Sequence, residues 1–360
     1  ADNTYDTNAL THGQIVSVRV TDGFGCTATS AGITMTVNPL PVVNLVSSDT
    51  DNSICAGSPV TFTATPSGAL SYDFRINNVS ALLSAVNTFT TSALADNEEV
   101  TVVVRTAAGC EATSAGIAMN VDAVPTTANA GLDQLTLCGV TSTTLTGNTP
   151  GTGAGQWTVV SGGGVTSFGD ATDAGTVFTG AAGETYVLRW TISTGGVCAA
   201  SSDEVTIRFD ETPVASAGAD IAQCANSTFT LGATNPALGT GQWSIISGPG
   251  TIANINSYNT TITGVTAGSS TTLRWTVTNG SCEDTDDVVL TNRNSPVPTL
   301  SSDFTTICAG ETVVFTAGGG TSYEFLINGS TAQNGADNTY DTNALTHGQI
   351  VSVRVTDGFG

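Results

Sequence analysis

The sequence predicts an all-β protein in which several small sandwich domains follow one another along the chain. Apolar residues alternate with their neighbours over short segments, turn-forming pairs such as Asp22-Gly23 separate these segments, and the same patterns return several times. A period of two is typical of half-buried strands, and no segment sustains the period of 3.6 that marks an amphipathic helix. Domains of about 85 residues with turns roughly every 8–12 residues are typical of an Ig-like sandwich.

The clearest predicted strand of each domain lies shortly before its second cysteine. Val100, Val102 and Val104 occupy alternate positions in one domain, and residues 187–192 and 15–20 show the same alternation. Valine and threonine are abundant in these segments, as strands prefer. Hairpin turns are expected at Asp22-Gly23, Gly195-Gly196, Asn279-Gly280 and Asn334-Gly335.

An identical segment occurs at both ends of the sequence. Residues 1–25 recur residue for residue at 336–360, an offset of 335 positions. Chance does not produce such identity, so the simplest interpretation is a tandem array with a period of 335 residues, of which this sequence is a window. An artificially duplicated segment is the alternative. The sequence starts in the middle of a pattern at Ala1 and shows no signal peptide, which agrees with an internal piece.

Weaker internal repeats divide each period into four domains. ICAG at 54–57 returns at 307–310, and GQW at 155–157 returns at 241–243. Pro-containing junctions such as NPLPVV at 38–43 separate the domains, and such short linkers limit bending, so we expect an extended rod. The expected domains are the C-terminal part of an Ig-like domain at 1–38, complete sandwiches at 39–122, 123–211 and 212–294, and the N-terminal part of an Ig-like domain at 295–360, which the next repeat completes.

Each domain holds two cysteines, and we expect one structural disulfide in each. Eight cysteines allow 105 connectivities, so the pairing is inferred from the repeats. The expected pairs are Cys55–Cys110, Cys138–Cys198, Cys224–Cys282, and Cys308 with the equivalent of Cys26 in the next repeat. These bonds should clamp loops, since the first cysteine precedes a strand and the second follows a turn. The alternative for Cys308 is pairing with a neighbouring chain that donates residues 26–38.

The disulfides imply an oxidising compartment, here the outside of a cell. Metal or thiol chemistry is the rival interpretation of the cysteines, but no CxxC occurs and co-ligands are scarce. Trp157 and Trp243 each follow the first cysteine of their domain at the same spacing. We expect them in the sandwich core; the alternative is a platform on which sugars stack.

The composition excludes several classes of function. The formal net charge is −22, only 11% of residues are charged, and all eight basic residues are arginine. Without lysine there is no P-loop, no Schiff-base chemistry and no Lys–Asn isopeptide bond. A chain so acidic, without a basic cluster, is not expected to bind nucleic acid. No apolar run approaches 18 residues, so no membrane span is expected.

Two domains share a pattern that resembles a known family. ANAGLD at 128–133 precedes GQW and LRWT in one, and ASAGAD at 215–220 precedes the same two motifs in the other. Over 127–210 and 215–290 this pattern resembles the PKD-like and Ig-like modules of giant surface proteins of gliding bacteria. The ICAG domains resemble the Ig-like modules found beside them. The resemblance implies tandem PKD-like and Ig-like sandwiches, export by type IX secretion, and a place in an adhesin or filament.

The sequence gives little support to catalysis, and we expect no enzyme and no catalytic residue. The two histidines, His12 and His347, are one position of the repeat counted twice. A serine nucleophile needs such a base nearby, and this one lies in a turn-like segment. Paired carboxylates stay possible in principle, but an acidic, solvated surface is the simpler interpretation.

Calcium is the only cofactor that the sequence makes conceivable. Calcium prefers carboxylate and carbonyl oxygens at flexible sites, although no DxDxDG loop occurs. The candidate ligands lie near domain boundaries, where an ion would stiffen a rod. They are Asp49, Asp51, Asp284, Asp286 and Asp287.

The sequence therefore predicts the repeat region of a very long extracellular filament or adhesin stalk at a cell surface. Its partners would be further copies of the repeat, joined covalently and packed laterally, and a glycan or protein bound by a tip outside this sequence. Two alternatives are an array of glycan- or protein-binding modules and an accessory region of a large secreted hydrolase.

Overall fold

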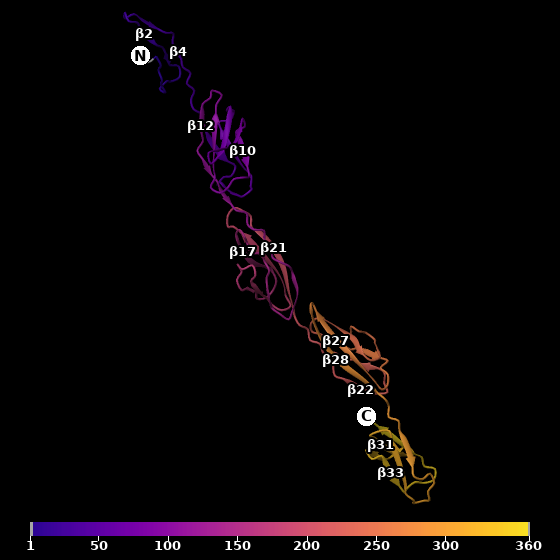
Figure 1. Ribbon diagram of the computed structural model, residues 1–360. Helices are drawn as coiled ribbons and strands as arrows, with labels where there is room; N and C mark the ends of the chain where they lie inside the picture. Colours follow the sequence, from indigo (N-terminus) through magenta and orange to yellow (C-terminus); the bar gives the residue numbers. More distant parts are fainter. Residues whose placement is uncertain (1–2, 359–360) are drawn as a thin grey trace. The chain divides into compact units, whose positions relative to one another are not determined.

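The computed structural model describes residues 3–358, and every regular element in that range is a β-strand. The strands form several Ig-like sandwiches in tandem, as the sequence predicts (Figure 1). The chain divides into two compact units, and the strands of the second complete sandwich, between residues 134 and 210, are divided between them. One comprises Ala1–Asp133, Ser142–Thr179 and Tyr186–Ile207, and the other Gln134–Thr141, Gly180–Thr185 and Arg208–Gly360. Between residues 3 and 358 no helix is long and apolar enough to cross a membrane.

The first described strands form one hairpin without a core. They are β1 (Ile15–Val16), β2 (Arg19–Thr21), β3 (Thr27–Thr29) and β4 (Ile33–Thr34), with β1 antiparallel to β4 and β2 antiparallel to β3. The turn predicted at Asp22-Gly23 is present, and the Asp22 carboxylate accepts hydrogen bonds from the backbone N–H groups of Phe24 and Cys26, both at 2.9 Å. Phe24 is 96% exposed, so the hairpin buries little apolar surface by itself.

The first complete sandwich is built from the strands between residues 44 and 122. One sheet has the order β10-β7-β5, and the other β12-β11-β8-β9, with β13 also on β11. The second strand, β6, and the last strand, β14, pair parallel to each other. The strands are β5 (Asn44–Ser47), β6 (Ser53–Cys55), β7 (Val60–Thr65), β8 (Ser71–Ile76), β9 (Val79–Ser84), β10 (Thr88–Thr91), β11 (Glu99–Arg105), β12 (Glu111–Thr113), β13 (Ile117–Ala118) and β14 (Asn120–Asp122).

The core of this sandwich comes from the alternating residues that the sequence singles out. Val100, Val102 and Val104 on β11 are fully buried, together with Tyr72 and Phe74 on β8. Burial of a valine side chain contributes roughly 1.5–3 kcal/mol, so β11 anchors the two sheets to each other. The strand predicted from the valine alternation is therefore confirmed.

The next two sandwiches share one topology. Their sheets have the orders β15-β21-β20-β17 with β16-β19-β18, and β22-β28-β27-β24 with β23-β26-β25. Figure 1 shows β27, β28 and β22 of the third sandwich side by side. The second has β15 (Gln134–Cys138), β16 (Ser142–Thr144), β17 (Ala154–Ser161), β18 (Ser167–Phe168), β19 (Val177–Thr179), β20 (Thr185–Ser193) and β21 (Ser201–Asp210). The third has β22 (Ile221–Cys224), β23 (Phe229–Thr230), β24 (Thr240–Ser247), β25 (Thr251–Ile252), β26 (Thr261–Thr263), β27 (Ser269–Asn279) and β28 (Cys282–Arg293).

The GQW and LRWT motifs are packing motifs. In the third sandwich Trp243 lies opposite Trp275, with ring centroids 5.0 Å apart, and both are 1% exposed. A Cβ on Gly241 would lie only 2.0 Å from the Trp275 ring, so this position has no room for a side chain. Trp157 is also buried, which confirms the expected core role of these tryptophans.

The last described domain is an incomplete copy of the first sandwich. Its sheets, β29-β30-β33 and β32-β31-β34, match β5-β7-β10 and β9-β8-β11. The hairpin turn expected at Asn334-Gly335 is wrong: both residues belong to β32, and the turn lies at Asn328-Gly329, where both φ angles are positive. The strands are β29 (Thr299–Ser302), β30 (Val313–Gly318), β31 (Ser322–Ile327), β32 (Ser330–Gly335), β33 (Thr339–Thr342) and β34 (Val351–Thr356).

Strand β34 has an open edge within the described residues. It pairs with β31 on one side, whereas β11 of the first sandwich pairs with β8 on one side and with β12 and β13 on the other. The apolar residues of β34 are accordingly half-buried instead of fully buried. The open edge is the one that a copy of residues 26–38 would cover.

Candidate functional site at the domain junctions

Two disulfides join successive domains. Cys55 of the first sandwich bonds Cys198 of the second, with Cα atoms 4.9 Å apart. Cys138 of the second bonds Cys282 of the third, with Cα atoms 5.2 Å apart. In both bonds the first cysteine of one domain is joined to the second cysteine of the next domain.

This arrangement corrects the expected pairing of one disulfide within each domain. The pairs Cys55–Cys110, Cys138–Cys198 and Cys224–Cys282 do not form. The thiols of Cys26, Cys110, Cys224 and Cys308 are free in the described chain, and the expected bond of Cys308 to the Cys26 of a following repeat stays a prediction.

The physical reason is that the two cysteines of a sandwich lie at its opposite ends. The parallel pairing of β6 with β14 places Cys55 opposite Asp122, where the chain leaves the domain. The turn after β11 carries Cys110 to the other end, where its Sγ lies 3.7 Å from the carbonyl oxygen of Asn38. The bonds therefore lie at the ends of domains but join neighbours. Cys55, Cys138 and Cys282 are end residues of strands, so only Cys198 lies in a loop as expected.

At the first junction, Asp122 holds the incoming turn. Its carboxylate accepts a 2.7 Å hydrogen bond from the backbone N–H of Val197. The Sγ of Cys198 lies 3.4 Å from the Asp122 carbonyl oxygen. A Cβ on Gly196 would lie 2.0 Å from the Asp122 carboxylate, so the turn needs glycine for this close approach.

Asp210 holds the second junction in the same way. Its Oδ2 accepts hydrogen bonds from Ser281, at 2.6 Å from the backbone N–H and 2.7 Å from the hydroxyl, and Arg208 forms an ion pair with Oδ1 at 3.0 Å. Cys282 Sγ lies 3.5 Å from the Asp210 carbonyl oxygen. Asp210 is only 8% exposed, and burial opposes its ionisation, but the hydrogen bonds from Ser281 and Arg208 outweigh burial and hold its pKa below the ordinary 3.8.

Sequence reasoning missed Asp122 and Asp210. A signal for them exists, because each stands three residues before the proline of a junction, in DAVP at 122–125 and DETP at 210–213. A carboxylate at the last position of a domain can accept hydrogen bonds from the turn of the next domain. The sequence does not reveal which turn will meet it.

The carboxylates considered for calcium make hydrogen bonds within the protein. Asp49 and Asp51 both accept a hydrogen bond from the backbone N–H of Ser53. Asp284 and Asp286 accept hydrogen bonds at 2.8 Å from the N–H groups of residues 215 and 217, which fixes the segment entering the third sandwich.

Asp287, the last calcium candidate, forms an ion pair with Arg274 on the neighbouring strand. The Nε–Oδ1 distance is 2.8 Å, and the hydrogen bond from Arg274 lowers the pKa of Asp287. Among residues 3–358, no three His, Cys, Asp or Glu side chains gather in an arrangement that could hold a metal ion.

The aspartates of the ANAGLD and ASAGAD motifs have a structural role as well. Asp133 accepts a hydrogen bond from Thr206 N–H at 2.7 Å, and Asp220 accepts one from Val289 N–H at 2.8 Å. The motif therefore docks the segment that precedes the first strand of each domain against its last strand.

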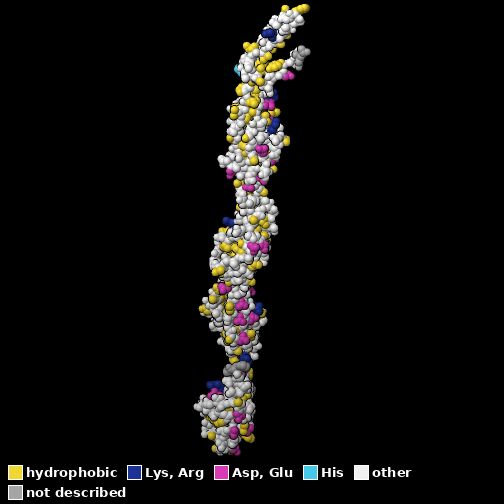
Figure 2. Space-filling view, turned by 90° about the vertical axis from the view of Figure 1, so that its left-hand side faces the viewer, with side chains coloured by type: hydrophobic (Ala, Val, Ile, Leu, Met, Phe, Trp, Pro, Cys, Tyr) yellow, Lys and Arg dark blue, Asp and Glu magenta, His cyan; other side chains and the backbone are white. Residues whose placement is uncertain are grey.

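Acidic side chains outnumber basic ones on the surface of the chain, as they do in the sequence. Figure 2 shows more Asp and Glu than Lys and Arg on the visible face. His12 and His347 are exposed, as expected for a turn. A dispersed negative surface repels like chains at low salt and is screened at physiological ionic strength.

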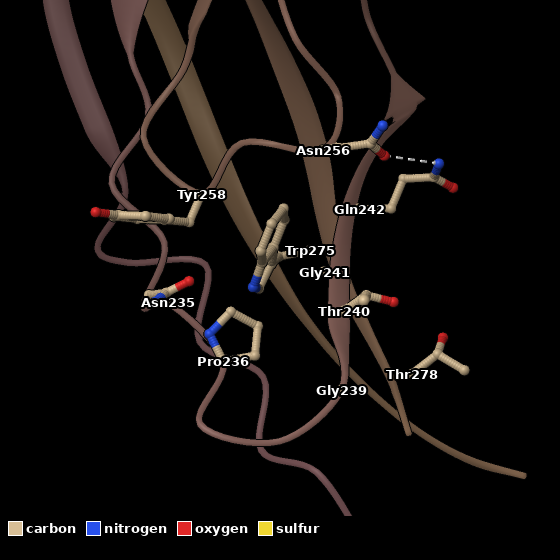
Figure 3. Close-up of a pocket in the computed structure, with 10 residues that line it drawn as sticks. All are labelled: Asn235, Pro236, Gly239, Thr240, Gly241, Gln242, Asn256, Tyr258, Trp275 and Thr278. Carbon is tan, nitrogen blue, oxygen red and sulfur yellow. Dashed lines mark hydrogen bonds between the residues drawn. The ribbon is translucent and has the colours of Figure 1, made fainter. Parts of the chain in front are cut away.

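One open depression of about 570 Å³ lies in the third sandwich. Asn235, Gln242, Asn256 and Tyr258 surround the edge of Trp275, and Gln242 donates a 3.2 Å hydrogen bond to Asn256 (Figure 3). Within the described residues, the indole N–H of Trp275 has no hydrogen-bond partner.

The corresponding tryptophan of the second sandwich has a satisfied indole. Its N–H, on Trp190, donates to the carbonyl oxygen of Asn148 at 3.2 Å. The depression and the unpaired N–H of Trp275 are thus features of the third sandwich that its motifs do not explain.

No protein-family model and no curated protein matches the chain. Solved structures similar to it include extracellular domains 3–5 of Drosophila OTK, with 14% identity over 67% of this chain and 93% of that one and a TM-score of 0.35. Immunoglobulin domains 1–5 of Sidekick-1 match with 13% identity, 92% and 83% coverage and a TM-score of 0.34. The D1–D4 ectodomain fragment of ICAM-5 matches with 11% identity, 87% and 98% coverage and a TM-score of 0.36. Each of these chains contains domains in tandem.

Proposed function

We propose that this chain is the repeat region of a very long extracellular filament or adhesin stalk, which supplies length and resistance to pulling. The observation that carries the proposal is the position of the two disulfides, each of which crosses a junction between domains. A bond within a domain protects only that domain, whereas a bond across a junction also transmits force to the next domain. The exact repeat of residues 1–25 at 336–360 supports an array of such domains.

The disulfides also support an extracellular location, because such bonds persist in oxidising compartments. The resemblance of the ANAGLD, GQW and LRWT motifs to modules of gliding bacteria supports placement at a bacterial cell surface after type IX secretion. On this proposal the chain carries no catalytic site. Its partners are further copies of the repeat, joined end to end and in contact laterally, and an adhesive tip elsewhere binds the target.

Electron microscopy of the native material, with the intact mass of the natural protein, tests this proposal. Threads or helically ordered filaments, and a mass many times that of one period, are the expected result. A natural protein of about 36 kDa without a longer precursor would contradict it. Single threads would indicate a stalk, and thicker ordered filaments would indicate that lateral faces of the sandwiches are working surfaces.

A second candidate function, glycan binding, is favoured by the depression in the third sandwich. Amide side chains beside the ring of Tyr258, which is 39% exposed, offer hydrogen bonds and an apolar surface to a small polar ligand. A glycan array probed with the whole chain tests it. Retention that is lost in Gln242→Ala and kept in Gln156→Ala, the matching glutamine of the second sandwich, would establish the site. Absence of retention would remove this candidate.

A further inference from the structure

We propose that the four free thiols complete two more bonds of the same kind when one copy of this sequence follows another in tandem. Cys224 would bond Cys26 of the following copy, and Cys308 would bond Cys110 of the following copy. The inference rests on the tandem array of the proposed function, and it replaces the pairing of Cys308 with the Cys26 equivalent. Every domain junction of the array would then carry one disulfide.

The first argument is that Cys224 occupies the same place as the two bonded first cysteines. The residue after each first cysteine donates its N–H to a carbonyl on the last strand of its own domain. The donors and acceptors are Ala56 to Asp122 at 2.8 Å, Gly139 to Asp210 at 2.9 Å, and Ala225 to Arg293 at 3.0 Å. Cys224 therefore stands where the chain leaves its sandwich, facing the next domain as Cys55 and Cys138 do.

The second argument concerns the neighbour of Cys224. Its Sγ lies 3.8 Å from Oδ2 of Asp357, in the turn after β34. Asp357 is the copy of Asp22, and in the complete hairpin the Asp22 carboxylate accepts the backbone N–H of Cys26 at 2.9 Å. The aspartate that positions Cys26 in one copy therefore lies beside Cys224 in the other. A cysteine four residues after Asp357 would be brought to Cys224.

The third argument is that Cys110 already has the contact made by the bonded second cysteines. Its Sγ lies 3.7 Å from the carbonyl oxygen of Asn38, the last residue of the preceding segment. Cys198 and Cys282 make the same contact with Asp122 and Asp210, at 3.4 and 3.5 Å. Cys110 is thus placed to bond a first cysteine from the domain that Asn38 ends.

That first cysteine is the Cys308 of the preceding copy. Residues 26–37 match 110–121, so Asn38 corresponds to Asp122, which pairs in register with Cys55. ICAG at 307–310 matches ICAG at 54–57, so Cys308 corresponds to Cys55. When residues 26–38 of the next copy complete the domain that starts at 295, Asn38 would lie beside Cys308 and bring Cys110 with it.

The spacing along the chain agrees with this pairing. The two observed bonds span 143 and 144 positions. With an offset of 335, the two proposed bonds each span 137 positions. A bond of Cys308 to the next Cys26 would instead span 53 positions and would have to join opposite ends of one sandwich.

Each new bond requires an oxidant, for which a small-molecule disulfide such as oxidised glutathione serves. One cysteine thiolate attacks the glutathione disulfide, forms a mixed disulfide and releases one glutathione thiolate. The partner cysteine then attacks the mixed disulfide and expels the second glutathione. The two cysteine protons pass to solvent, and the two electrons are carried by the two reduced glutathiones.

The test is a two-copy chain, residues 1–360 followed directly by residues 26–360. Cys26 and Cys110 of the first copy and Cys224 and Cys308 of the second are replaced by serine, so that each of the four cysteines under test occurs in one copy only. After refolding with oxidised glutathione, digestion without reductant and mass spectrometry identify the linked peptides. The bonds Cys55–Cys198 and Cys138–Cys282, present in both copies, are the internal control.

The expected map links Cys224 to the second-copy Cys26 and Cys308 to the second-copy Cys110. Replacing Cys224 with serine should remove the first link and keep the second, and Cys308→Ser should do the reverse. A link between Cys308 and the second-copy Cys26, or free thiols at all four positions beside intact control bonds, would overturn the inference. This failure is distinguishable from failure of the proposed function, which the mass and appearance of the natural protein decide.

Discussion

At the residue scale, single side chains at the end of each domain decide how the next domain is held. Asp210 receives two hydrogen bonds from Ser281 and an ion pair from Arg208, and it is nearly buried. Removing the charge of a buried hydrogen-bond acceptor lowers stability more than the same change at an exposed site, because water cannot replace the weakened interaction. Asp122 makes the equivalent contact with Val197 at the first junction.

Asp210→Asn should therefore weaken the second junction by about 1–3 kcal/mol at neutral pH. The folded-state pKa of Asp210 is lowered, so its contribution is complete above about pH 4 and is lost as pH falls through the folded value below 3.8. Urea unfolding at pH 7 and pH 3 measures this. The variant should lose part of the acid sensitivity of the natural chain, whereas Asp341→Asn, at an exposed aspartate, should keep it. Equal acid sensitivity in Asp210→Asn would refute this role.

Gly241→Ala should destabilise the third sandwich by at least about 1–3 kcal/mol, because the added methyl group would overlap the Trp275 ring. Thermal unfolding followed by tryptophan fluorescence is the measurement. Gly232→Ala in the same domain is the matched control, since no atom lies within 4 Å of a Cβ at that position. Comparable stability of the two variants would show that the GQW glycine is not a packing requirement.

At the element scale, the sequence predicts strands well and their distant neighbours poorly. Alternating valines locate β11 because burial on one face of a strand leaves a local pattern. The parallel pairing of β6 with β14 leaves no local pattern, although it decides that Cys55 and Cys110 lie at opposite ends. The cysteines of the candidate site were therefore predicted, and their partners were not.

Strand β34 allows a direct test of domain completion. Extending the chain after Gly360 with residues 26–38, with serine at the Cys26 position, should cover the open edge of β34 in the way that β12 and β13 cover β11. Backbone amides of Val351–Thr356 should then exchange with deuterium at least about tenfold more slowly. A scrambled extension of the same composition is the control. Unchanged exchange with the natural extension would mean that these residues do not complete the domain.

At the scale of the whole molecule, the two disulfides interlock. The loop closed by Cys55–Cys198 overlaps the loop closed by Cys138–Cys282 over residues 138–198. A pulling force therefore passes through the first disulfide from Cys55 to Cys198, along the backbone back to Cys138, and through the second disulfide to Cys282. The backbone between Cys55 and Cys138 and between Cys198 and Cys282 lies outside this path and is not fully extended. Unfolding of one sandwich cannot release its full length while the bonds persist.

Pulling single chains from their two ends, with and without reductant, tests this account most directly. At about 3.5 Å per residue, the fully unfolded chain with reduced cysteines should extend on the order of 1,250 Å. With both junction disulfides intact, the extension should be shorter by on the order of 600 Å, because the load bypasses most of the first and third sandwiches. Disulfides within the individual domains would shorten the extension by a similar total. In that case Cys55→Ser and Cys138→Ser would each lengthen the unfolding step of one domain only. The interlocked bonds predict instead that either variant changes the release of two neighbouring domains together; release confined to one domain would contradict the account.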